Sequence, residues 1–328
     1  MLDLAPVSSG RSSAEALEES VALARHVEAL GYGRVWVAEH HGMPGIASSA
    51  PAVLIAALAA ATSRIRVGSG GVMLPNHAPL VVAEQFGTLE GLYPGRIDLG
   101  LGRAPGTDQR TASLLRRGDA DDFPGELALL RAFFDGPVEG ISAVPAEGNA
   151  PDVWLLGSSG FSAQLSGLLG LPFAFAHHFS GHNTIPALEL YRSSFRPGVL
   201  AEPYAMVCAS VLVADSREQA RRRALPGALS FVRLRLGTPG PLSTIAEAEG
   251  YPWTPQERAF AEQRLDSQVL GPLEQVREQL DRLLADTGAD ELMVTTTAHA
   301  FEDRLRSYER LAELGVTSGD ALGLPRAA

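Results

Sequence analysis

Histidine, serine and glycine follow directly after several short β-branched runs of this sequence. The first such place is Glu39, His40 and His41, at the end of the run RVWVAE. A neutral imidazole can exchange a proton with a reacting oxygen near pH 7. Successive residues of a strand face opposite sides, so one histidine would serve a site while the other packs or orients it. His40 and His41 are therefore candidate catalytic residues.

The segment LGSSGFS, at residues 156–162, combines a strand end, a turn of small residues and the start of a helix. The first N–H groups of a helix lack internal acceptors, and the helix dipole is positive there. Such a place can seat a phosphate, and Arg103 at a neighbouring strand end would add charge-assisted contacts. An ordinary serine-capped helix explains the segment equally well, so the residues alone leave both interpretations open.

Gly70 and Gly71 directly follow the run RIRVGS. Glycine after a strand allows unusual backbone geometry or the close approach of a flat ligand. A simple turn would need the same residues, so the spacing does not decide between these two interpretations.

Metal binding is the main alternative for the histidines. His40, His41, His177, His178 and His182 supply imidazoles, but no His-x-His stands at a strand end and no HExxH motif occurs. Adjacent histidines point apart, so the sequence predicts no metal site. The P-loop, the GxGxxG turn and the GxSxG nucleophile elbow are also absent.

These residues belong to a chain that alternates between short strands and amphipathic helices, which favours a parallel sheet with right-handed crossovers. Eight such units in 328 residues fit one α/β domain over 1–328, a single (β/α)8 TIM barrel with insertions near 102–122, 136–150 and 237–270. Two doubly wound domains are the alternative, but no convincing linker divides the chain. In such a barrel the site lies at the carboxyl ends of the strands. The expected strands cover 2–5, 34–39, 64–69, 96–101, 153–156, 173–176, 204–214 and 291–296.

Charge and composition narrow the class of protein. The net charge of −11 argues against a nucleic-acid partner or an anionic membrane surface, since both require clustered Lys and Arg. The single cysteine, Cys208, lies in an apolar run and is expected in the core, so nothing requires an oxidising compartment. No signal-peptide pattern is present, and the apolar stretch 50–61 is shorter than the ~20 residues of a spanning helix. A cytoplasmic protein without a membrane segment is predicted.

Three segments together resemble the luciferase-like flavin monooxygenases, and most closely the subgroup of antibiotic-tailoring monooxygenases. They are GYGRVWVAEHHG at 31–42, the long run RIRVGSGGVMLPNHAPLVVAEQFGTLEGLYPGRIDLGLGRAPGTD at 64–108, and WLLGSSGFSAQLSGLLGLPFAFA at 154–176. The resemblance implies a (β/α)8 barrel that binds reduced FMN, or in some branches a reduced deazaflavin. It also implies use of molecular oxygen, a separate flavin reductase and a homodimer.

The resemblance also implies roles for single residues. His40 matches the active-site histidine of the family, and Gly70–Gly71 matches a non-proline cis peptide under the flavin ring. The implied cofactor-binding residues are Gly70, Gly71, Arg103, Ser158, Ser159, Gly160, Phe161, Ser162 and His177. Two positions depart from the pattern: Gly102 stands where luciferase has a cysteine, which argues against light emission, and Ser158 replaces an acidic residue.

The sequence thus predicts an FMN-dependent monooxygenase that oxygenates a small apolar or aromatic organic substrate, in secondary metabolism. The long segments 102–122 and 237–255 are candidate lids, because both are rich in Gly or Pro. The alternatives are a deazaflavin-dependent hydride transferase, a non-catalytic flavin-binding protein and a metal-dependent hydrolase on the same barrel.

Overall fold

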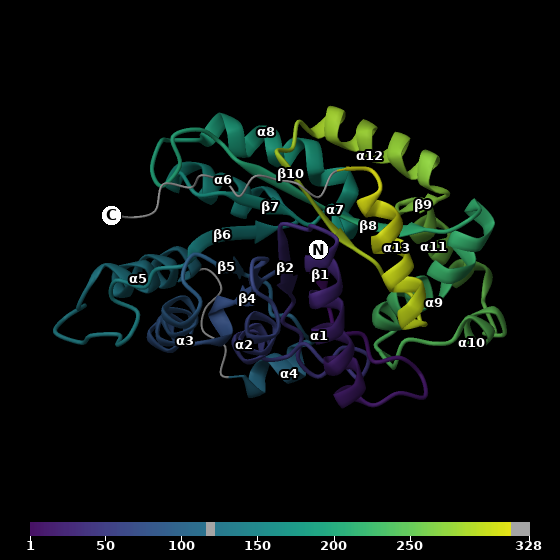
Figure 1. Cartoon of the computed structure of the whole chain (residues 1–328), viewed down its shortest axis with the longest axis horizontal. Coiled ribbons are helices and arrows are strands. Elements are labelled where there is room, and N and C mark those ends of the chain that lie inside the picture. The colour runs from purple at the N-terminus through teal and green to yellow at the C-terminus, as the bar shows by residue number, and fades with distance from the viewer. Residues whose placement is uncertain (116–121, 316–328) are drawn as a thin grey trace.

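A computed structural model describes residues 1–115 and 122–315, and its centre is a curled sheet of parallel strands (Figure 1). Every pairing between its strands is parallel, as the strand–helix alternation predicts. The main path runs in chain order through β1 (Leu2–Asp3), β2 (Arg34–Val37), β3 (Arg66–Ser69), β5 (Ile97–Gly102), β6 (Asp152–Gly157), β7 (Phe173–Phe175), β8 (Ala205–Val213) and β10 (Glu291–Thr295).

These are the eight predicted strands, with bounds shifted by one or a few residues. Two short strands lie off this path and were not predicted: β4 (Val72–Met73) pairs with β5, and β9 (Val269–Gly271) pairs with β8. The path ends at β1 and β10, and in the described part of the chain no pairing joins these two ends. The predicted barrel is therefore confirmed as a curled parallel α/β sheet, without a demonstrated closure.

Helices follow the strands and cover the outside of the sheet (Figure 1). They are α1 (Ser13–Ala29), α2 (Pro51–Ala61), α3 (Pro79–Leu92), α4 (Gln109–Leu114), α5 (Phe123–Asp135), α6 (Gly160–Leu169), α7 (His177–Ser180), α8 (Thr184–Ser194), α9 (Arg217–Arg235), α10 (Ile245–Glu249), α11 (Pro255–Asp266), α12 (Leu273–Thr287) and α13 (Phe301–Ala312). Two 3-10 turns, η1 (Leu74–Asn76) and η3 (Gly181–Asn183), complete the described helical elements.

The helix ends follow local chemistry. Ser12 caps α1 in a reciprocal pair with Glu15, and Pro79 occupies the first turn of α3, where its missing N–H has no consequence. Gly288 ends α12 with a φ of 56°, a left-handed conformation that favours glycine. In the described chain, no helix combines the length and apolar character needed to cross a membrane.

The predicted insertions hold short helices. The segment 102–122 contains α4, which Asp108 caps, while residues 116–121 fall outside the described part. The segment 237–255, a candidate lid in the sequence, contains α10, which begins with a capping box between Thr244 and Glu247. A five-residue helix has too few apolar positions to show a helical period in sequence, so its capping box was the remaining signal.

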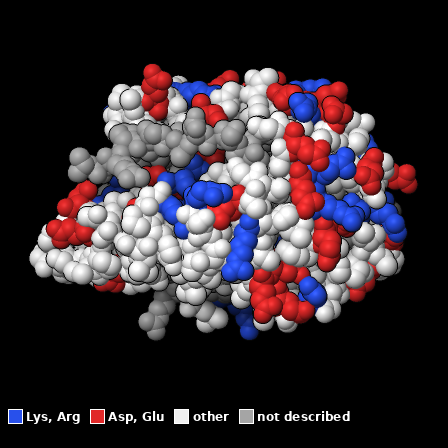
Figure 2. Space-filling model, viewed as in Figure 1, with Lys and Arg blue, Asp and Glu red and all other residues white. Residues whose placement is uncertain are grey.

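Apolar side chains form separate clusters inside and outside the sheet. Trp36 and Trp154 pack edge to face within the sheet, in a cluster that also buries Cys208, as predicted. A further cluster joins α9 and α11 to β9. It is distinct from the large core, which extends from α1 to α5 and also includes residues of α12 and α13. On the face shown in Figure 2, charged side chains of both signs are interspersed over the right-hand part, where α9 to α13 lie.

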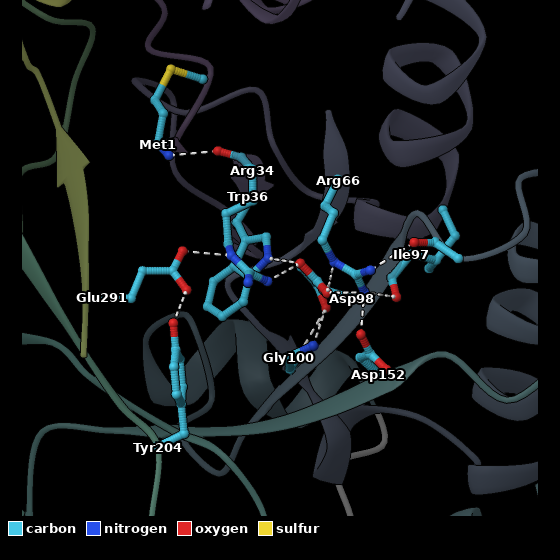
Figure 3. A network of polar contacts seen from close by, with 12 residues as sticks. Met1, Arg34, Trp36, Arg66, Ile97, Asp98, Gly100, Asp152, Tyr204 and Glu291 are labelled. Atoms are coloured by element: carbon cyan, nitrogen blue, oxygen red, sulfur yellow. Dashed lines mark hydrogen bonds and ion pairs between the residues drawn. The ribbon is translucent and has the colours of Figure 1, made fainter. Parts of the chain in front are cut away.

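A buried ion network joins the amino ends of the strands (Figure 3). Asp98 accepts from Arg34 Nη1 at 2.6 Å, from Arg66 Nη2 at 2.6 Å and from Trp36 Nε1 at 2.8 Å. Burial by itself raises the pKa of Asp98, but the two guanidiniums outweigh it and hold that pKa below its ordinary value. Arg34 also donates to Glu291, so the network ties β2, β3 and β5 to β10. This end of the sheet therefore serves stability.

Candidate functional site

A cavity of about 240 Å³ opens at the carboxyl ends of the strands. The ends of β1, β2, β8 and β10 contribute to its wall, together with α7, α9 and α11 and the segment around 239–242. Apolar side chains supply most of the wall, among them Met43, Ile46, Phe179, Phe231 and Leu242. A cavity of this character suits a small organic ligand.

His40 lines this cavity just beyond the end of β2. The strand stops at Val37, so the chain turns before the histidine pair and the alternation of a strand does not apply to it. The Nδ1–H of His40 donates to the carbonyl of Gly106 at 3.1 Å, because a carbonyl can only accept. Burial lowers the pKa of His40, so the ring is neutral at pH 7 and Nε2 keeps its lone pair.

His178 lines the same cavity from α7, which follows β7. Its Nδ1–H donates to the carbonyl of Cys208 at 3.2 Å, which again leaves Nε2 as the acceptor. Burial lowers the pKa of His178 to about 4, so this ring is also neutral. His177, the predicted cofactor ligand, is not in the cavity wall; its Nδ1 lies 2.7 Å from the Thr184 hydroxyl.

His41 does not line the cavity but contacts a buried carboxylate. Oε1 of Glu39 lies 2.9 Å from His41 Nε2 and 2.8 Å from His77 Nε2. Burial raises the pKa of Glu39, but the hydrogen bonds from His77 and His41 outweigh it and lower that pKa overall. One carboxylate and two imidazoles lie close enough to hold a metal ion. Without a metal ion, Glu39 is hydrogen-bonded to both imidazoles, so the three side chains also form a hydrogen-bonded cluster. Glu39 and His41 flank His40 in the sequence.

The predicted phosphate segment does begin a helix. Ser159 is the N-cap residue of α6, and its side chain makes no capping hydrogen bond, so the hydroxyl is not engaged by the helix. The Arg103 guanidinium, from the end of β5, lies 4.1 Å from the ring centre of Phe161 in the first turn of that helix. Ser162 is buried and packs against Gly157. A Cβ added to Gly157 would lie only 2.8 Å from the Cβ of Ser162. Ser159 and Arg103 thus both lie at the start of α6, where the sequence predicts a phosphate.

The peptide bond between Gly70 and Gly71 is cis, in agreement with the expectation from the resemblance. Both residues are tightly packed at the end of β3. A Cβ on Gly71 would lie 2.7 Å from the carbonyl oxygen of Gly100, and a Cβ on Gly70 would lie 2.8 Å from Leu2 Cδ1. Glycine is thus required here by the neighbouring chain as well as by local geometry.

Several residues of the cavity were not predicted as site residues. His178 was noted at a strand end but not selected, and Phe231 and Arg264 lie on α9 and α11, away from any strand end. Helices α9 and α11 reach the cavity by packing on each other, which no local pattern reveals. Helix α11 contains two arginines, Arg258 and Arg264, and nothing in the sequence tells which of them faces the cavity.

The family model for luciferase-like monooxygenases matches residues 1–291 of the chain. The chain belongs to this family. A luciferase-like monooxygenase of Escherichia coli K12 is 50% identical over 315 residues, which are 94% of this chain and 94% of that protein. The crystal structure of apo-MsnO8 is 38% identical, with a TM-score of 0.89 over 96% of this chain and 98% of that chain.

Membership in the luciferase-like monooxygenases makes the chain an oxidoreductase, as the sequence predicted. The fold is shared more widely. A type II Baeyer–Villiger monooxygenase of Pseudomonas putida, solved in complex with FMN, has a TM-score of 0.72 at 17% identity, covering 97% of each chain. At that identity the likeness concerns the fold alone.

Proposed function

We propose that this luciferase-like monooxygenase uses reduced FMN and molecular oxygen to oxygenate a small apolar or aromatic organic substrate, in a reaction of secondary metabolism. The observation that carries the proposal is the order of features around the sheet. Gly70–Gly71, Arg103 and the start of α6 follow β3, β5 and β6, which are consecutive strands. The apolar cavity begins where this series ends, at His40 on one side and His178 on the other.

The residues after β3, β5 and β6 fit a flavin mononucleotide. The N–H groups at the start of α6 and the Ser159 hydroxyl would hold the phosphate, and Arg103 would add a positive charge. The cis peptide between Gly70 and Gly71, which is packed against Leu2 and the Gly100 carbonyl, would support the flat ring with its backbone. Ser158, Gly160, Phe161, Ser162 and His177 complete the proposed seat. Bound reduced FMN would supply the electrons that activate molecular oxygen.

His40 is the group that we assign to proton transfer. Its Nδ1–H is held by the Gly106 carbonyl, so Nε2 is the atom that accepts or returns a proton in the cavity. His41 would act indirectly, since it holds Glu39 in place one residue before His40. The apolar walls exclude water from the reacting atoms.

The proposal includes partners and location. Reduced FMN would come from a separate flavin reductase in the cytoplasm. A second copy of the chain would cover α2, which is built only from apolar residues and exposes Val53, Ala57 and Ala60. Val81 and Leu92 on the neighbouring α3 are also exposed. An exposed apolar surface of this kind is typical of a subunit interface.

Anaerobic titration with reduced FMN and with a reduced deazaflavin, followed by addition of ¹⁸O₂ and a panel of apolar and aromatic substrates, tests the proposal. We expect preferential binding of reduced FMN and ¹⁸O in one product. Preference for the deazaflavin, with hydride transfer and no oxygen uptake, would support the hydride transferase instead. Tight flavin binding without any oxygenated product would indicate a flavin-binding protein.

A further inference from the structure

Arg264 is a cation in the cavity wall. It extends from α11, and its Nη1 donates to the backbone carbonyl of His178. Its guanidinium carbon lies 4.6 Å from the ring centre of Phe231, and Phe231 stacks on Phe260 at an interplanar angle of 16°. These contacts fix the guanidinium on one side of the cavity, next to His178.

No carboxylate of the described chain pairs with Arg264. Other arginines of these two helices do have such partners. Arg221 of α9 and Arg258 of α11 both form ion pairs with Glu262. The cavity wall does contain the carboxylate of Asp3, but that group is paired with Arg304 at 2.6 Å. Burial lowers the pKa of Arg264, and no nearby anion counteracts this effect.

A partly buried guanidinium without a counter-ion is unfavourable, because it has lost water without gaining an anion. The single hydrogen bond to the His178 carbonyl leaves the rest of the planar fork for a ligand. A carboxylate matches that fork with two parallel hydrogen bonds. The apolar walls formed by Phe179, Phe231 and Leu242 suit the remainder of the same molecule.

We propose that the cavity takes a substrate with an apolar body and one carboxylate, and that Arg264 is the specificity-determining residue that pairs with this carboxylate. The inference rests on the proposed function in one respect, since it takes the cavity as the substrate site. The charged end of the substrate would lie beside α11 and His178, and its apolar body would extend towards His40.

Calorimetric titration of the flavin-free protein with 3-phenylpropionate and with 3-phenylpropanamide tests the proposal, because the two probes differ in charge and little in shape. We expect the wild-type protein to bind the acid at least ten-fold more tightly than the amide. Arg264→Gln should remove this preference by weakening the acid alone, and Arg264→Lys should retain part of it. Arg258→Gln, on the same helix but outside the cavity wall, is the matched control and should behave as wild type.

The proposal would be overturned by equal affinity of the wild-type protein for acid and amide, by no binding of either probe, or by an equal loss for both probes in Arg264→Gln. Weaker binding of reduced FMN by Arg264→Gln would also overturn it, since the arginine would then serve the cofactor. If Arg264→Gln does not fold, the wild-type comparison and the Arg264→Lys variant decide the matter.

These measurements do not need flavin, so they separate the two proposals. An acid preference without any oxygen-dependent product would refute the monooxygenase proposal and leave the carboxylate site standing. Oxygenation of the amide and the acid with equal kcat/KM would refute the carboxylate site alone.

Discussion

His40 and His178 line one cavity and share one hydrogen-bond pattern. Each ring donates Nδ1–H to a backbone carbonyl, that of Gly106 for His40 and that of Cys208 for His178. Each therefore keeps an unprotonated Nε2 in the cavity at neutral pH. His40 follows β2 and His178 follows β7, and the strands between them on the path carry the proposed flavin seat. The two histidines thus lie where the proposed flavin seat meets the cavity.

Replacement of His40 should affect turnover rather than cofactor binding. We expect His40→Gln to lower kcat by about 10²- to 10⁴-fold, the usual range for loss of a positioned acid or base. The affinity for reduced FMN should change by no more than about three-fold. His41→Gln, which acts through Glu39, should cause a smaller loss. Steady-state rates and anaerobic flavin titrations measure both effects; equal losses in the two variants would argue against the direct role of His40.

The phosphate seat can be tested with two flavins. Arg103→Gln should weaken the binding of reduced FMN by roughly 10- to 100-fold, as expected for a charge-assisted hydrogen bond. Reduced riboflavin lacks the phosphate, so its affinity should be the same in the variant and the wild-type protein. Anaerobic fluorescence titrations give both constants. A parallel loss for riboflavin would mean that Arg103 supports the fold of the site and not the phosphate.

Gly70 and Gly71, which follow β3, should differ in how well each tolerates replacement by alanine. In Gly71→Ala the new Cβ meets the Gly100 carbonyl oxygen at 2.7 Å, and this backbone atom cannot move aside easily. In Gly70→Ala the nearest atom is the end of the Leu2 side chain, at 2.8 Å, which can rotate. We expect Gly71→Ala to lose about 1–3 kcal/mol and Gly70→Ala less. Chemical unfolding of both variants checks this order, and the reverse order would contradict it.

The ion network at the amino ends of the strands predicts that replacing Asp98 lowers stability strongly. Asp98→Asn leaves the guanidiniums of Arg34 and Arg66 without their shared counter-charge, so stability should fall by about 3–5 kcal/mol. Asp215→Asn is the matched control, because its pair with Arg310 is exposed and should contribute less than about 1 kcal/mol. Urea unfolding curves measure both. A small effect at Asp98 would mean that the desolvation of the network cancels its attraction.

The neutral state of His178 predicts a dependence of stability on pH. Its pKa is about 4 in the folded chain, whereas an unfolded histidine titrates near 6.5. Its contribution is therefore fully present above about pH 6.5 and declines as the pH falls towards 4, because the unfolded chain binds the proton first. Between pH 7.5 and 5 this histidine should cost roughly 2 kcal/mol. His178→Gln should flatten the decline by that amount in urea unfolding at the two pH values; an unchanged slope would contradict it.

Local chemistry explains which parts of the fold the sequence could predict. Pro79 and Gly288 mark helix ends whatever surrounds them, so the bounds of α3 and the end of α12 follow from the residues. The strand β9 has three residues and, among the described strands, pairs with β8 alone, so its existence depends on a distant partner. No residue of α4 is buried, so this helix has no apolar face that would mark it in the sequence.

Some residues of the candidate site could likewise be selected from the sequence, and others could not. Ser159 and His40 could be selected because a parallel sheet gathers the residues at its strand ends. Arg264 could not, because its place depends on how α11 packs against α9 and on an insertion whose path is set by tertiary contacts. That His178 rather than His177 lines the cavity was equally beyond a local pattern, since the chain enters α7 at that point and strand alternation no longer applies.

The helices α9 and α11 that carry Phe231 and Arg264 have an apolar cluster of their own, distinct from the large core of the sheet. The ion network around Asp98 lies at the other end of the strands. Changes in the cavity-lining side chains of these helices should therefore disturb neither the main core nor the network. In evolutionary terms, the wall formed by α9 and α11 can change to accept a new compound while the core and the ion network of the sheet stay the same.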